Sequence, residues 1–425
     1  MNAVPGVPEE PQEPQEPEAR FEPDAGFEVS AALRPALARA VERAGPGLQA
    51  LILSGSHATG EAVWTSFEGR DVTLSDVDLY AVVRREAATA TPLASAHERR
   101  AWGLLAPVEV AFVTLAGLAH MPARPGTVEL ARSGRVVAGD PGVLARLPRW
   151  EPAAIAAEER LLLLENRAFE LLWADALWPA RTRSAGAAGP VDAAETLQRL
   201  RARHALLKTA LELASARTLT HGELPAGAGA RVARARDLGA PDGAPSWLAG
   251  AWDGLAPLWE EALAWRAGAA RLVSDEAQAV SWRAVTRAWC MAWWAEGGRG
   301  AAADPWERAL GVAARGSLAR RLRRSLAASP GAGPAPGRIE RLRRAPAGTP
   351  ANRIHGSGAL LMLAAASAPG EPQLPAGALR ALHALGVTRA SGFTTAAREA
   401  LVAWDRQLHA GERTADLDEL DRSRP

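Results

Sequence analysis

The chain has 425 residues, of which 48% are hydrophobic and 23% are charged. These are the proportions of an ordinary folded protein of two or three domains, and they exclude a chain that is disordered throughout. No apolar run approaches the roughly 20 residues that span a bilayer, so no membrane partner is expected. The single cysteine, Cys290, excludes an intrachain disulfide and a cysteine-rich zinc site. The first residues lack the features of a secretory signal, and we expect a cytoplasmic protein.

The net charge of +1 is divided unequally along the chain. Residues 1–28 hold eight acids and one arginine, a net charge of −7, which leaves +8 for the rest. This first segment repeats Pro, Glu and Gln, so we predict a disordered acidic tail. A mildly basic body favours anionic ligands, among which nucleic acid is one candidate.

Residues 29–148 have the pattern of a small mixed α/β domain. Apolar residues recur at helical spacing in some segments and alternate with polar residues in others. We predict helices at 30–44 and 95–105, strands at 48–53, 76–81, 108–113 and 135–138, and an inserted hairpin or loop at 64–72.

Beyond residue 150 the strand pattern ends and helical periodicity continues. Long helices are predicted at 153–177, 193–220, twice within the Trp-rich stretch 245–296, and again over 356–410. We divide this part into a helical substrate-side domain at 149–328, a Gly/Pro/Arg-rich linker at 329–350 and a C-terminal helical region at 351–425. The predicted fold class is α+β, a small mixed-sheet domain followed by a larger all-helical domain.

Three acids and a Gly-Ser turn carry the chemistry of the first domain. Asp76 and Asp78 are two residues apart on a predicted strand, so both carboxylates project from one face. Two hard oxygen ligands suit Mg²⁺, which proteins typically hold by carboxylates together with substrate phosphates. Glu109, on a strand of matching alternation, brings a third carboxylate. Gly55 lets the backbone approach a phosphate, and Ser56 offers its hydroxyl and amide, so we predict a site for a nucleoside triphosphate and metal.

With Gly55-Ser56, the acids Asp76 and Asp78, and Glu109, residues 30–145 resemble the nucleotidyltransferase superfamily typified by DNA polymerase β. The small-molecule and antitoxin-type branches are the most similar. The resemblance implies that the three acids bind two Mg²⁺ ions, that the Gly-Ser turn holds the β- and γ-phosphates, and that Glu109 helps activate the attacking hydroxyl. It further implies transfer of a nucleoside monophosphate from ATP or another triphosphate to a hydroxyl of a small molecule or protein, with release of pyrophosphate. Two departures are the glutamate at 109, where aspartate is more common, and the long gap before Asp76.

The helical part offers fewer specific signals. Lys208 is the only lysine of the chain; it is placed either to bind the triphosphate or to pair with Glu212, four residues on. Arg199 and His204 have the Arg-x4-His spacing of the HEPN ribonuclease-type bundles that often accompany such transferases. His204 also lies on the apolar stripe of its predicted helix, which favours a packing role. His57 fits a phosphate contact and a surface position equally well.

Two other functions use the same residues. A nucleotide-binding regulatory protein of the antitoxin type keeps the pocket and has little or no turnover. An RNA-acting protein uses the arginine cluster at 315–344, although the sequence contains no nucleic-acid-binding motif.

Overall fold

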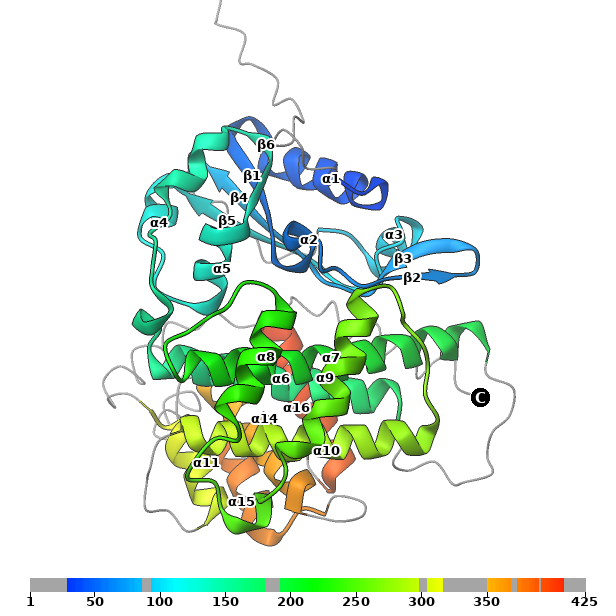
Figure 1. The fold of residues 1–425 in the computed structure, drawn as a ribbon, viewed down its shortest axis with the longest axis vertical. Coiled ribbons are helices and arrows are strands. Elements are labelled where there is room, and N and C mark those ends of the chain that lie inside the picture. Colours follow the sequence, from blue (N-terminus) through cyan, green and yellow to red (C-terminus); the bar gives the residue numbers. More distant parts are fainter. Residues whose placement is uncertain are drawn as a thin grey trace, which may run out of the picture.

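The computed structural model describes residues 29–85, 93–179, 192–297, 304–315, 350–367, 373–389 and 391–408. The predicted acidic tail at 1–28 and nearly all of the predicted linker at 329–350 lie outside these residues. A small mixed sheet with short helices is followed by a larger helical part, which confirms the predicted fold class. In Figure 1 the blue and cyan sheet domain lies above the green-to-orange helices.

The sheet domain is built on four strands in the order β5-β4-β1-β6. The middle strand β1 (Leu48–Ser54) is antiparallel to both β4 (Val77–Val83) and β6 (Arg135–Gly139), whereas β5 (Val108–Thr114) is parallel to β4. The four predicted strands are therefore confirmed. One detail differs: β4 begins at Val77, so Asp76 lies in the connection just before the strand.

Alternation along the strands sorts side chains onto the two faces of the sheet. On one face Leu51, Leu79 and their neighbours pack against α1 (Arg34–Ala44). On the other face Ile52 and Val82 share an apolar cluster with residues of α4 (Leu115–Ala119) and α5 (Pro125–Ser133). Asp78 precedes Val82 by four residues, so its side chain lies on the α4 and α5 face.

The predicted insert at 64–72 forms a hairpin. Its strands β2 (Trp64–Phe67) and β3 (Arg70–Thr73) pair with each other in a separate two-stranded sheet. Val72, with Val63 and Leu74 beside the hairpin, belongs to the apolar core of the helical part. The insert therefore forms part of the boundary between the sheet domain and the helices.

The connection from β4 to β5 crosses over the sheet, as a parallel pair requires. It contains α3 (Ala96–Ala101), which is shorter than the predicted helix at 95–105. Ser95 caps this helix by accepting a hydrogen bond from the Glu98 amide. The chain turns at Gly103, whose φ of +81° lies in the left-handed region that favours glycine.

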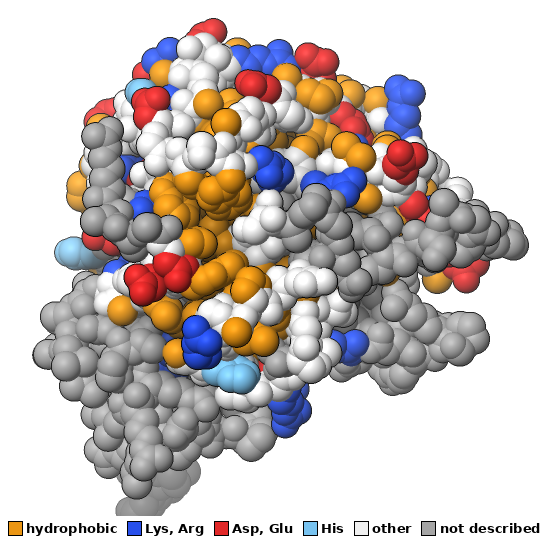
Figure 2. Space-filling view, turned by 90° about the horizontal axis from the view of Figure 1, so that it is seen from below, with side chains coloured by type: hydrophobic (Ala, Val, Ile, Leu, Met, Phe, Trp, Pro, Cys, Tyr) orange, Lys and Arg blue, Asp and Glu red, His pale blue; other side chains and the backbone are white. Residues whose placement is uncertain are grey.

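The helical part contains the predicted long helices and two shorter ones, α8 and α11, that the sequence analysis did not identify. Its elements are α6 (Ala157–Leu177), α7 (Ala193–Leu219), α8 (Ala228–Leu238), α9 (Ala256–Arg266), α10 (Asp275–Glu296), α11 (Pro305–Ala313), α14 (Pro350–Ser367), α15 (Ala376–Leu385) and α16 (Phe393–Leu408). Within the described ranges, no helix is both long and apolar enough to cross a membrane. Viewed from the end away from the sheet, acidic and basic groups are scattered between apolar side chains (Figure 2).

One apolar core joins the early and late helices. Phe169 on α6 stacks on Trp404 of α16, with ring centroids 5.1 Å apart. Two buried tryptophans of α10 also bind α6: Trp282 donates to the Leu171 carbonyl at 3.0 Å and Trp289 to the Leu164 carbonyl at 2.6 Å. The helices described within 149–328 and within 351–425 therefore share a single core.

Candidate functional site

The Gly-Ser turn lies directly against Asp78. It begins α2 (Gly55–Thr59), which follows β1 without an intervening residue, and Gly55 has a φ of +65°. A Cβ on Gly55 would lie 2.8 Å from Asp78 Oδ2, so only glycine allows the carboxylate to come this close. Ser54, opposite Asp78 in the strand register, donates its hydroxyl to the Asp78 carbonyl at 3.3 Å. The predicted turn and the predicted acid are thus brought together.

The three predicted acids lie at one end of the β4 and β5 pair. Glu109 is the register partner of Asp78 on the neighbouring parallel strand, so their side chains project from the same face. Asp76 precedes β4 by one residue, and its carboxylate is therefore not oriented by the strand. Burial, together with the negative charges of Glu109 and Asp76, raises the pKa of Asp78 to about 7. The three carboxylates are close enough to repel one another.

A buried polar network holds the segment that carries Asp76. The Val63 amide donates to Ser75 Oγ at 2.9 Å, and Thr73 Oγ1 donates to the Val63 carbonyl at 3.2 Å. His57 Nε2 lies 3.4 Å from the Ser75 carbonyl oxygen, and burial lowers the pKa of His57. His57 is only 6% exposed, so the surface position, one of its two expected alternatives, is wrong. The sequence analysis did not identify Thr73 or Ser75, although Ser75 begins the Ser-Asp-x-Asp segment.

Helix α7 brings a cation to the acids. Lys208 Nζ forms an ion pair with Asp76 Oδ2, across the boundary between the helices and the sheet domain. Glu212, the alternative partner of Lys208 in the sequence analysis, instead lies 4.0 Å from Arg167 on α6. Lys208 and Arg167 are the positive groups that oppose the rise in the Asp78 pKa. Arg167 was not predicted as a site residue, because nothing in its local sequence places it near the sheet.

A cavity of about 20 Å³ lies beside the Lys208–Asp76 pair, between the sheet domain and helices α6 and α7. Its lining on the helical side includes Glu170, Trp173, Arg201 and His204. The Arg201 guanidinium lies over the Trp173 ring, 4.8 Å from the ring centroid. Burial and the Lys208 ammonium lower the pKa of His204 to about 3, so this imidazole is neutral. His204 therefore borders the site, and a buried, neutral imidazole is consistent with its expected packing role.

The Arg-x4-His spacing on α7 does not produce a joint site. The Arg199 guanidinium pairs with Glu195 at 2.9 Å and with Asp275 at 3.1 Å, and it lies over the Trp178 ring at 5.0 Å. Arg199 thus binds α7 to neighbouring segments of the helical part, whereas His204 borders the cavity at Asp76. The two residues have separate surroundings.

The arginine cluster at 315–344 lies outside the described residues except for Arg315. The guanidinium of Arg315 donates to both carboxylate oxygens of Glu165, each at 2.8 Å. Glu165 is fully buried in α6. Arg315 therefore has a partner inside the protein, which is a packing role rather than a surface one.

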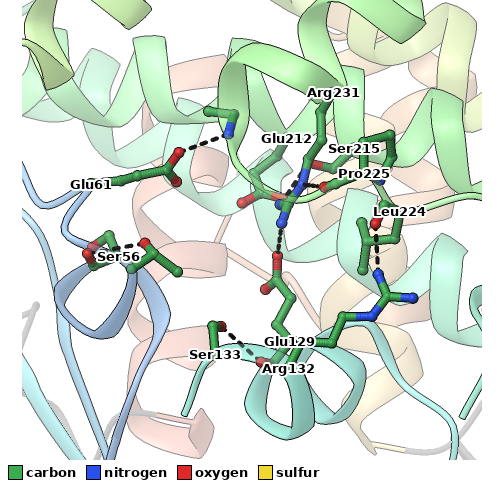
Figure 3. A network of polar contacts seen from close by, with 12 residues as sticks. Ser56, Glu61, Glu129, Arg132, Ser133, Glu212, Ser215, Leu224, Pro225 and Arg231 are labelled. Atoms are coloured by element: carbon green, nitrogen blue, oxygen red, sulfur yellow. Dashed lines mark hydrogen bonds and ion pairs between the residues drawn. The ribbon is translucent and has the colours of Figure 1, made fainter. Parts of the chain in front are cut away.

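Glu61, which follows α2, links the sheet domain to the helices by hydrogen bonds beside the Gly-Ser turn. Its carboxylate accepts hydrogen bonds from the first amide of α8, at Ala228, and from Arg266 at the end of α9, at 2.8 and 2.6 Å. A second contact between the two parts is the ion pair of Glu129 on α5 with Arg231 of α8. Figure 3 shows Ser56, Glu61 and Glu129 on the sheet-domain side facing Arg231 and Glu212 from the helices. Charged contacts therefore join the sheet domain to the helices at two further places.

The chemistry of the acids fits a divalent cation. Asp76, Asp78 and Glu109 supply hard carboxylate oxygens, and a cation bound between them would relieve the repulsion that raises the Asp78 pKa. Among the described residues, no group of three or more His, Cys, Asp and Glu side chains is arranged to hold a metal ion. The Asp76 carboxylate instead forms an ion pair with Lys208. The acids are gathered in one place, but they do not form a ready-made metal cage.

Comparison of the chain with family models, with curated proteins and with solved structures gives no match. The function is therefore inferred from the site residues and their surroundings.

Proposed function

We propose that the protein is a Mg²⁺-dependent nucleotidyltransferase that moves a nucleoside monophosphate from a triphosphate to a hydroxyl of a small molecule or protein. The observation that supports this most is the close contact of Gly55 with Asp78, the register partner of Glu109. It joins a turn whose backbone can approach a phosphate to a group of hard carboxylates. A metal–triphosphate complex requires both features in one place.

The proposed roles follow from the position of each residue. Asp76, Asp78 and Glu109 would hold Mg²⁺, which when bound neutralises charge on the triphosphate and lowers the pKa of the acceptor hydroxyl. Ser56, next to Gly55, offers its hydroxyl to the β- and γ-phosphates. Lys208 offers a positive charge to the phosphates from α7.

In the proposed reaction the acceptor oxygen forms a bond to the α-phosphorus. The bond between that phosphorus and the oxygen leading to the β-phosphate breaks, and pyrophosphate leaves with the electron pair. Glu109 accepts the proton of the acceptor hydroxyl. Positioning and charge neutralisation supply nearly all the catalysis in such a transfer, so few groups of the chain need to react.

Transfer of label tests the proposal. The protein is incubated with Mg²⁺ and the four nucleoside triphosphates labelled at the α-phosphate, in the presence of small hydroxyl compounds or of cell proteins. Pyrophosphate release and labelled acceptor are measured. Asp78→Asn is expected to lower the rate at least about 10³-fold, because a lost metal ligand removes several kcal/mol of charge stabilisation. Asp71→Asn, an exposed acid on β3, is the matched control and should retain the rate. Undiminished Mg²⁺-dependent transfer by Asp78→Asn would contradict the proposal.

A nucleotide-binding regulatory protein is the second candidate. The pairing of Asp76 with Lys208 favours it, because an acid that is already paired with an ammonium supports ligand binding more readily than metal-dependent chemistry. This candidate predicts stabilisation by a triphosphate that Asp78→Asn abolishes, without pyrophosphate release in either acceptor pool. The described part of the arginine cluster, Arg315, is paired with Glu165 and does not favour an RNA-acting protein.

A further inference from the structure

Lys208 joins the two parts of the molecule at the site. Its side chain is 22% exposed, that of its partner Asp76 is 18% exposed, and the two residues are 132 positions apart in the chain. Their ion pair therefore forms only while α7 lies against the sheet domain. A ligand that displaces Lys208 from Asp76 therefore also breaks a contact between α7 and the sheet domain.

Asp76 has one carboxylate for which two cations compete. In this structure the ammonium of Lys208 occupies it, and the cavity beside the pair measures about 20 Å³. That volume holds about one water molecule, since each needs roughly 10–15 Å³ of such space. Mg²⁺ gives up its waters reluctantly and usually keeps several of them. The ion therefore cannot reach Asp76 through this cavity while the Lys208–Asp76 pair stays closed.

Apart from Asp78 and Glu109, which the incoming metal would take, the carboxylates near Lys208 are already paired with another cation. Glu212, one turn later on α7, and Glu170 on α6 lie 4.0 and 3.5 Å from Arg167 and are already paired with it. His204, one turn earlier, is neutral. An ammonium displaced from Asp76 therefore needs an anion that arrives with the ligand.

We propose that Lys208 is an exchangeable cation that controls entry to the site. Binding of a divalent cation with a polyphosphate transfers Asp76 from the ammonium to the metal, and the released ammonium pairs with the phosphates. The identity of the ligand rests on the proposed function, and the exchange adds a mode of regulation to it. Metal alone must compete with Lys208, whereas metal and polyphosphate together give both Asp76 and Lys208 a new partner.

The exchange predicts opposite changes in the affinities for two probes when Lys208 is replaced. The probes are Mn²⁺ alone, followed by its paramagnetic resonance, and inorganic tripolyphosphate in saturating Mg²⁺, followed by calorimetry. Lys208→Gln removes the ammonium that competes for Asp76, so Mn²⁺ alone should bind about tenfold more tightly. The same replacement removes a cation that pairs with phosphate, so tripolyphosphate should bind about tenfold more weakly. Lys208→Arg keeps the charge and should move both affinities less. Circular dichroism confirms that each variant is folded.

Opposite shifts of the two affinities support the exchange. A parallel loss of both would mean that Lys208 only holds the domains together, and unchanged affinities would mean that it does not compete for Asp76; either result overturns the proposal. If the wild type binds neither probe and releases no pyrophosphate, the proposed function fails as well. If the wild type transfers nucleotide but Lys208→Gln shows no opposite shifts, the exchange alone is refuted.

The uniqueness of Lys208 gives a second readout. Reductive methylation with ¹³C-formaldehyde labels this side chain and the terminal amine, because the chain has no other lysine. The Lys208 methyl resonance should shift in Asp76→Asn, which breaks the ion pair, and in the wild type when Mg²⁺ and tripolyphosphate are added together. A resonance that neither change moves would overturn the proposal.

Discussion

The two parts of the molecule surround their buried acids differently. In the helical part, Glu165 is fully buried and both of its oxygens accept hydrogen bonds from Arg315. In the sheet domain, Asp78 has the acids Glu109 and Asp76 as its neighbours. The positive groups that oppose this charge come from α6 and α7, on the other side of the domain boundary.

This difference distinguishes a buried acid that stabilises the core from buried acids that are suited to bind a ligand. A two-pronged arginine–carboxylate pair satisfies the hydrogen-bonding groups of both partners and fixes the geometry of a core. Acids gathered beside one another instead raise each other's pKa and cost stability, so they are expected where a ligand offsets the charge. Asp78, at the start of β4, is therefore an acid of the second kind, whereas Glu165 is of the first.

The largest expected effect is on the packing side of this comparison. Arg315→Ala leaves the Glu165 carboxylate buried without its arginine, and we expect a loss of about 3–5 kcal/mol in the free energy of unfolding. Urea denaturation measures it. Arg39→Ala, which removes an exposed partner of Glu98, is the control and should change stability little. If the two replacements cost the same, the Arg315–Glu165 pair does not stabilise the helical core.

The second effect has the opposite sign and concerns the site. The pKa of Asp78 is about 7 in the folded protein, above its ordinary value of 3.8. The fold therefore favours the protonated carboxyl, and the stability this provides is present below pH 4 and lost as the pH rises through 7. Asp78→Asn removes the charge and should be more stable than the wild type at pH 8 by up to about 4 kcal/mol.

Unfolding by urea at pH 4, 6 and 8 in the presence of a chelator follows this effect. The gap between Asp78→Asn and the wild type should widen as the pH increases. A gap that stays constant over this range would show that Asp78 is not held among like charges.

The smallest expected effect distinguishes the backbone conformation of the turn from the contact of Gly55 with Asp78. Gly55 and Gly60 both have positive φ, +65° and +75°, so alanine at either position should cost about 1–2 kcal/mol of stability. A Cβ at Gly60 meets nothing within 4 Å, whereas one at Gly55 meets the Asp78 carboxylate. Only Gly55→Ala should weaken the binding of tripolyphosphate in Mg²⁺, measured by calorimetry. Equal weakening in both variants would argue against a site at this contact.

The features that depend on residues close together in the sequence could be predicted from the sequence. The apolar run at 48–53 identified β1, the alternation over 108–113 identified β5, and the Gly-Ser turn at the end of β1 identified the place where Asp78 is approached. The same pattern extended one residue too far at Asp76, because a polar residue beside a strand end fits the alternation whether or not it pairs.

The helical side of the site could not be predicted in the same way. Arg167 and Arg201 reach the acids or their cavity only through the packing of α6 and α7 against a sheet domain formed by an earlier part of the chain. The position of His204 beside the cavity was not predicted because α7 is buried on most of its circumference, so a stripe at helical spacing does not distinguish the core from the domain boundary. The rarity of lysine was the one local signal on this side, and Lys208 does lie at the acids.

Metal binding at the three acids is the most direct measurement of what this site does. Mn²⁺ binding in the presence of tripolyphosphate is compared among the wild type, Asp76→Asn, Asp78→Asn, Glu109→Gln and the exposed control Asp71→Asn. We expect the wild type and Asp71→Asn to bind alike, and each of the other three to bind at least about tenfold more weakly, since each loses a charged oxygen ligand. Binding of Mn²⁺ that is unchanged in all three site variants, or absent from the wild type, would contradict a metal–triphosphate site at the start of β4.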